Sequence, residues 1–316
     1  MLNYLLRRLN LLLITGFILT VITFILTRWS TSEYTAESPY VIDYLNYLWA
    51  LIQGDWGYSM IDQQPLLMKG WLAFYSTLQL CFLAFIVAAI IGIPLGMIAA
   101  LNRKRLIDYF IMFMILASLA LPSFWLALII IMSLNSLGIN FPIEPSVNMD
   151  LSSTFLLFHT LFNDNSYTEQ LFLERLVRIL LSACVLSFFL VSEITRITRH
   201  AITAILKTNY IKAAYTKGLS NTHIVLNHVL KNALPSIIQQ IKIQLSTMIS
   251  FAMVIEVVFS IPGAGSWVMQ SVDSGDYLAL PTTIILIALF ISIISILVDI
   301  LLVFISPVKR KSLYVG

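Results

Sequence analysis

The chain has 316 residues, of which 59% are hydrophobic and only 11% are charged, and its formal net charge is +3. Soluble domains carry about 25% charged residues, so this composition excludes a water-soluble globular fold. The apolar residues occur in long runs without the alternation of barrel strands, and we therefore expect an all-α integral membrane protein.

Six runs approach the length of about 20 apolar residues that a transmembrane helix needs. They are Leu9–Thr27, Leu78–Leu101, Tyr109–Leu134, Leu176–Ile194, Ile237–Phe259 and Pro281–Ile305. Six spans place both termini on the same side of the membrane. The first run follows Arg7 and Arg8, but it is longer than the apolar part of a signal peptide and has no cleavage site after it. We interpret it as a retained anchor.

Two loops on the other side of the membrane follow the first and third spans. Tyr40–Ile52 is apolar and aromatic but too short to cross, which predicts a helix lying on the outer surface. The next segment, Gln53–Ser59, predicts turns at its two glycines. The second outer loop, Asn135–Glu174, is rich in Asn, Asp and Ser, and both a re-entrant helix and a surface helix stay open for its apolar patch.

The second and third spans contain residues that perturb a helix. Gly92 and Gly96 allow another helix to approach closely, and Pro94 between them loosens the backbone hydrogen bonding. Pro122 predicts a kink in the third span. These four residues are candidate hinges, and simple helix packing is the alternative.

Basic residues are divided unevenly between the two sides that six spans define. Fourteen of the 19 Lys and Arg residues fall on the side of the termini, and only four fall on the other side. By the positive-inside rule, the side of the termini is the cytoplasm. Acidic residues gather on the outer side, which either favours a cationic substrate near the outer mouth or reflects only a solvated loop surface.

The stretch Tyr210–Pro235 is polar and basic and lies between two membrane-length apolar runs. It must therefore lie outside the bilayer, on the predicted cytoplasmic side. Ala213, Ala214 and Gly218 are spaced for a helix with a smooth face that ends in a sharp turn at the glycine. We interpret the stretch as a docking surface rather than a simple connector.

The fifth span is unusually polar on one face, and such a face lines a cavity more often than it faces lipid. Near its outer end, Glu256 precedes a turn rich in proline and glycine, where a gate role and a structural cap are both open. The candidate pathway or gate residues are Gln240, Gln244, Glu256, Pro262, Gly263 and Gly265. Three further charged residues, Glu193, Lys242 and Asp299, lie within or at the ends of apolar runs.

Enzyme signatures are missing from the sequence, which has no phosphate-binding loop, no Gly-x-Ser-x-Gly and no His-Glu-x-x-His. His223 and His228 are five residues apart, a spacing that does not bring two side chains together on an α-helix. We expect no catalytic residue, no metal site and no cofactor, and an energy source that resides in a partner.

Several segments resemble, in the same order, those of bacterial ABC importer permeases of the dipeptide and oligopeptide type. Lys212–Gly218, followed by Asn232–Pro235, resembles the "EAA" loop of that family, with Lys212 where the name of the loop places Glu. The agreement extends over nearly the whole chain, at Arg7-Arg8, Gly54–Ser59, Gly92–Gly96, Pro122–Leu126, Phe259–Gly265 and Ser306–Arg310. Within this family, Leu245–Met248 and Ala252–Ser260 are most similar to the Sap-type permeases.

The resemblance implies a type I importer permease in the bacterial inner membrane that works with partners and does not bind nucleic acid. These partners are a second similar permease, two cytoplasmic ATPases and a periplasmic solute-binding protein. Residues 1–73 would form the first helix and a periplasmic loop, 74–305 the core with a coupling loop at 196–235, and 306–316 a cytoplasmic tail. The ATPase-coupling residues would be Tyr210, Lys212, Ala213, Ala214, Lys217, Gly218, Leu219, Asn232, Ala233, Leu234 and Pro235.

The resemblance also implies a substrate class. Sap-type systems are associated with uptake of antimicrobial peptides and resistance to them, so we expect ATP-driven import of cationic peptides. Di- and oligopeptides, haem and putrescine are alternatives within the same family. An ion-coupled transporter that uses Glu256, Lys242 or Asp299, or a membrane scaffold without transport, would belong to another class.

Overall fold

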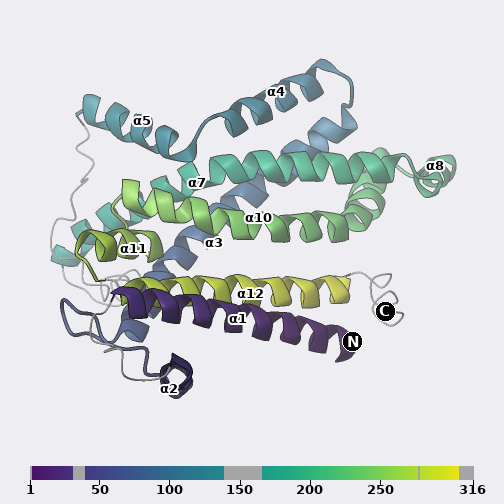
Figure 1. The fold of residues 1–316 in the computed structure, drawn as a ribbon. Helices are drawn as coiled ribbons and strands as arrows, with labels where there is room; N and C mark the ends of the chain where they lie inside the picture. Colours follow the sequence, from purple (N-terminus) through teal and green to yellow (C-terminus); the bar gives the residue numbers. More distant parts are fainter. Residues whose placement is uncertain (1, 31–39, 139–165, 277, 306–316) are drawn as a thin grey trace. The chain divides into compact units, whose positions relative to one another are not determined.

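The computed structural model describes residues 2–30, 40–138, 166–276 and 278–305 (Figure 1). In these ranges every extended regular element is a helix, apart from one isolated bridge between Tyr58 and Pro65. The helices are α1 (Leu2–Ser30), α2 (Tyr40–Gln53), α3 (Leu66–Leu101), α4 (Leu106–Ala120), α5 (Ser123–Ser136), α7 (Ser166–Leu206), α8 (Asn209–Thr216), α9 (Asn221–His223), the π-helix η3 (Ile224–Leu230), α10 (Lys231–Val258), α11 (Ala264–Asp273) and α12 (Ala279–Ile305).

The helices confirm the prediction of an all-α membrane protein. Four helical stretches among the described residues are long and apolar enough to cross a bilayer: Leu66–Leu101, Leu176–Leu206, Asn221–Val258 and Ala279–Val298. The pair α4 and α5 makes a fifth if the two helices form one broken span. The first predicted span falls on α1, whose Leu13–Leu26 part is apolar but shorter. The second outer loop lies mostly outside the described residues, as do the C-terminal tail and the side chains of Arg7, Arg8 and Asp299.

The predicted kink at Pro122 is confirmed, and it separates two helices instead of bending one. Helix α4 ends at Ala120, α5 begins at Ser123, and the two are bent by 90°. Leu121 has an extended backbone with ψ 122°, the conformation into which a following proline pushes a residue. The proline ring prevents the helical turn that would join the two halves, so the predicted kink is a complete break between two helices.

The chain divides into two compact units, which we describe separately. The first contains residues 1–79, 142–178 and 256–294, and the second contains 80–141, 179–255 and 295–316. In the first unit, α2 is the helix predicted for Tyr40–Ile52, and it packs on α1. Arg28 of α1 binds Asp43 at 2.5 Å, and the hydroxyl of Thr20 lies 2.9 Å from that of Tyr44. The predicted turns are confirmed, since Gly54 and Gly57 have φ of 87° and 81°.

In the second unit, α3 and α7 approach each other at the two glycines that the sequence singled out. A Cβ added at Gly92 would lie 2.9 Å from Ile194, and one added at Gly96 would lie 2.6 Å from Thr198 and 2.7 Å from the carbonyl oxygen of Thr195. The predicted close approach is confirmed. Pro94 lies inside α3, which continues through it as one helix.

A buried ion pair fixes α4 to α7 in the same unit. Arg199 donates to Asp108 through Nε at 2.6 Å and through Nη2 at 2.8 Å, and the backbone N–H of Lys104 donates to the same carboxylate at 3.0 Å. Asp108 is buried, so this two-bond contact satisfies a charge that would otherwise be costly.

Substituting Gly96 by Ala should destabilise the protein by about 1–3 kcal/mol, because the added methyl group collides with backbone that cannot move independently. Gly16→Ala in α1 is the matched control, since a Cβ there meets nothing within 4 Å. Thermal unfolding of both variants in detergent checks this, and equal midpoints for the two would contradict the close packing of α3 on α7.

Candidate functional site

The predicted docking stretch begins with a short helix and a turn. Helix α8 covers Asn209–Thr216, and Gly218 follows with φ 76°, a conformation that glycine adopts without strain. The predicted helix with a glycine turn is thus confirmed. Nothing lies within 4 Å of a Cβ added at Gly218, so the turn projects into open space.

The alanines of the stretch do not form the smooth outer face that we expected. Ala214 is buried together with Ile211 on the inner side of α8, and Ala233 is fully buried. The reason is helical geometry, since adjacent residues point about 100° apart and Ala213 and Ala214 cannot share one face. Ala213 is exposed, but most of the exposed side chains beside it are larger and partly basic: Tyr210, Lys212, Tyr215, Lys217 and Leu219.

Two tyrosine hydroxyls tie α8 to the helical segment after it. Tyr215 donates to Oδ1 of Asn221 at 2.7 Å, and the hydroxyl of Tyr210 lies 2.6 Å from Nδ1 of His228. The Tyr210 and His228 rings also meet edge to face, with centroids 5.6 Å apart. Such a ring contact and a hydrogen bond each contribute about 0.5–1.5 kcal/mol.

The two histidines of this segment lie together, contrary to our expectation from their spacing. The ring centroids of His223 and His228 are 5.6 Å apart, and Nδ1 of His223 lies 3.0 Å from the amide nitrogen of Asn227. The cause is the π-helix Ile224–Leu230, whose hydrogen bonds join residues five apart and bring residues at that spacing onto one face. Our expectation from the spacing of the histidines was based on an α-helix at this position.

The remaining coupling candidates open the long helix α10. Asn232 is exposed, whereas Leu234 and Pro235 are half-buried beside the buried Ala233. Pro235 lies inside the helix and removes one backbone donor, which weakens the helix at the point where it leaves the exterior segment.

One of the two candidate glutamines on α10 contacts a buried carboxylate. Nε2 of Gln244 donates to Glu193 of α7 at 3.0 Å, and Arg196 binds the same oxygen at 2.6 Å. Glu193 is buried, and its charge is therefore balanced inside the second unit. Gln240 is half-buried on the same helix.

The residues that follow α10 form a turn that Glu256 holds from inside. Glu256 is fully buried, and it accepts a hydrogen bond from the N–H of Gly265 at 2.8 Å. The N–H of Ala264 donates to the hydroxyl of Thr77 at 2.9 Å. A carboxylate at the start of α11 satisfies donors that a helix N-terminus leaves free and is favoured by the helix dipole. Of the two roles considered for Glu256, gate and structural cap, the cap is the one that requires this contact.

Gly263 is the position where a side chain would collide with this cap. A Cβ built there would lie 2.2 Å from the carboxyl carbon of Glu256. The N–H of Gly263 donates to Ser266 at 2.8 Å, and α11 begins at the next residue, Ala264. The backbone of Gly263 is extended, a conformation that any residue adopts. The glycine is therefore needed for the space that it leaves and not for its backbone conformation.

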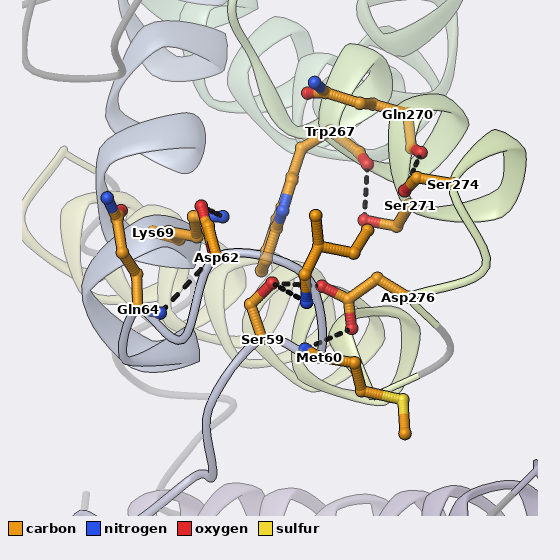
Figure 2. A network of polar contacts seen from close by, with 11 residues as sticks. Ser59, Met60, Asp62, Gln64, Lys69, Trp267, Gln270, Ser271, Ser274 and Asp276 are labelled. Carbon is orange, nitrogen blue, oxygen red and sulfur yellow. Dashed lines mark hydrogen bonds and ion pairs between the residues drawn. The ribbon is translucent and has the colours of Figure 1, made fainter.

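A second network, which the sequence reasoning missed, holds the turn Ser59–Gln64 in the first unit. Figure 2 shows Ser59 and Met60 directed at Asp276, which follows α11. The Ser59 hydroxyl donates to the carboxylate at 2.5 Å, and the N–H of Met60 donates at 3.3 Å. Ser59 and Asp276 are both buried. Ser and Asp are both common in turns, so neither residue stands out in the sequence, and their separation by 217 residues gives no sign that they meet.

Asp62 and Lys69 form an ion pair beside that network. Burial raises the pKa of the Asp62 carboxyl, but the hydrogen bonds from Lys69 and from the Gln64 backbone outweigh it, and the pKa lies below its usual value. The carboxylate therefore stays charged down to acidic pH, and this contribution to stability is lost only as the pH falls through the lowered pKa.

The clash between Gly263 and Glu256 predicts non-additive substitutions. Gly263→Ala should lower stability by about 1–3 kcal/mol, because the methyl group displaces the carboxylate from Gly265. In a Glu256→Ala background the same substitution should cost clearly less, since the group it strikes is gone. Unfolding midpoints of the two single variants and the double variant check this, and strictly additive effects would contradict it.

Comparisons with known proteins were made for the whole chain. The model of the family described as "Binding-protein-dependent transport system inner membrane component" matches residues 92–311. The putrescine export system permease protein SapB of Escherichia coli K12 is 32% identical over 99% of this chain and 99% of its own length. The peptide transport system permease protein SapB of Salmonella typhimurium is 32% identical over the same shares.

Two further similarities are more distant. The di/tripeptide transport system permease protein DppB of Pseudomonas aeruginosa is 30% identical over 95% of this chain and 96% of its own length. A solved inward-facing structure of the MetNI methionine ABC transporter is 17% identical and covers 83% of this chain and 98% of that chain. Its TM-score of 0.47 is too low to bear on the fold.

Proposed function

Because the chain belongs to the family of inner membrane components of binding-protein-dependent transport systems, we propose that it is the permease subunit of an ATP-driven peptide importer. The observation that carries this proposal is the similarity to peptide permeases over nearly its full length. The chain is a multi-pass membrane protein of the inner membrane, and its role is transport rather than catalysis.

The energy for transport would come from two cytoplasmic ATPases that bind the exterior segment Asn209–Pro235. This segment supports the proposal by its charge, because the exposed Lys212 and Lys217 offer cations to an acidic cleft. Gly218 gives it a projecting turn with open space around it. The cytoplasmic location follows from the excess of basic residues on the side of the termini.

The other partners would be a second, similar permease and a periplasmic solute-binding protein. A single chain would then contribute half of a pathway, with Gln240 and Gln244 on α10 facing it and the turn Pro262–Gly265 near its outer end. The bend at Pro122 and the close contacts of Gly92 and Gly96 are the proposed hinges. Residues 74–305 would form the core of this half, with 196–235 as its coupling loop, flanked by 1–73 and a tail at 306–316.

The substrates that we propose are cationic peptides. Relatives named SapB are described as peptide transport permeases, and the predicted outer loops of this chain are acidic. Export of putrescine is the second candidate, because the Escherichia coli K12 relative is named as a putrescine export permease. Both substrates are cations, so outer acidic residues do not separate them.

Gly218→Glu should abolish binding of the ATPases, because it places a bulky anion in a turn that needs a positive φ and that faces the partner. We expect about a tenfold or larger loss of ATPase that co-purifies with the tagged permease. Gly138→Glu is the matched control, since Gly138 also has a positive φ and open space. A Gly218→Glu permease that still co-purifies with the ATPases would contradict the proposal that they bind at this turn.

Transport assays in cells with and without the gene should separate the substrates. We expect a labelled lysine-rich peptide to accumulate only in cells that carry the intact permease, while efflux of labelled putrescine is unchanged. Loss of putrescine efflux without loss of peptide uptake would favour the second candidate. Uptake in vesicles that an ion gradient drives without ATP would instead favour an ion-coupled transporter.

A further inference from the structure

Helix α8 is held at both ends by the tyrosine contacts described above. The bond between Tyr215 and Asn221 joins residues six apart and closes the glycine turn. The contact between Tyr210 and His228 joins residues 18 apart and reaches past α9 into the π-helix. Beneath these contacts, α8 packs on η3 through an apolar layer of Ile211, Ala214, Ile224, Val225 and Val229, all buried. The two helices therefore form one packed body.

The position of His228 depends on the π-helix. In an α-helix, five residues turn through about 500°, so His223 and His228 would point about 140° apart. Across α9 and η3 they lie together, and the ring of His228 contacts both the Tyr210 ring and the His223 ring. Conversion of this stretch to an α-helix would break the ring contact between the histidines and turn His228 relative to Tyr210. The Tyr210 contact thus favours the π-helical register of the residues that continue directly into α10.

We propose that the contact between Tyr210 and His228 is the link that passes movement of α8 to α10. This inference rests on the proposed function, in which an ATPase binds α8. The exposed side chains of α8 are available to that partner, while the Tyr210–His228 contact and the apolar layer bind the helix to the base of α10. Tyr210 and His228 are therefore positioning residues, and Pro235 marks the weakened point beyond them.

Hydrogen exchange of the assembled transporter in nanodiscs tests this link without a known substrate. In the wild-type complex, ATP should change amide exchange both in Asn209–Thr216 and in Lys231–Val258. In Tyr210→Phe, compared with the wild type at equal ATPase occupancy, the ATP-dependent change in Lys231–Val258 should be lost. Without ATP, exchange in Asn209–Thr216 should become about three- to tenfold faster, the factor expected when one net hydrogen bond is removed.

Two further variants distinguish the link from general damage. Tyr109→Phe removes a hydroxyl from an exposed tyrosine of α4 and should behave as the wild type. Exchanging the partners in Tyr210→His with His228→Tyr should restore the response of Lys231–Val258.

A Tyr210→Phe complex that keeps the full response of α10 to ATP would overturn the inference and leave the proposed function standing. If the wild-type chain captures no ATPase at all, the proposed function is wrong, and the inferred link falls with it.

Discussion

A backbone surrounded by lipid must find its hydrogen-bond partners within the protein, and this constraint governs the described structure. Most residues meet it through helices. Where a long helix stops inside the chain, at the turn before α11, a buried carboxylate and a hydroxyl take over, since Glu256 and Thr77 accept from the N–H groups of Gly265 and Ala264. The glycine at 263 then follows from the carboxylate, because no larger residue leaves it space.

The same constraint explains how charged residues persist in an apolar chain. Two buried carboxylates among the described side chains of the second unit have specific donors: Asp108 is bound by Arg199, and Glu193 by Arg196 and Gln244. The contacts of Arg199 and Gln244 connect helices that are distant in sequence and leave little freedom in how they pair.

The segment Asn209–Pro235, which we propose to lie outside the bilayer, follows different physics, because water could satisfy its backbone there. Its order comes from side chains, through the tyrosine contacts of α8 and the apolar layer beneath them. A π-helix is energetically poorer than an α-helix and occurs mostly at functional sites. Here it lies between α8, where we propose that an energy-supplying partner binds, and α10, a helix long and apolar enough to cross the membrane.

The sequence by itself determined the membrane class, the kink at Pro122 and the turn at Gly218, because each depends on composition or on one residue's backbone preference. The sequence also indicated the family, since the family's motifs are short segments that occur in the same order along this chain. Only the tertiary structure decided which side chains meet. Ser59 and Asp276 lie 217 residues apart, and Tyr210 reaches His228 only because the helix between them is of the π type. Such contacts depend on how helices pack and on their register, and neither has a signature in the order of residues along one chain.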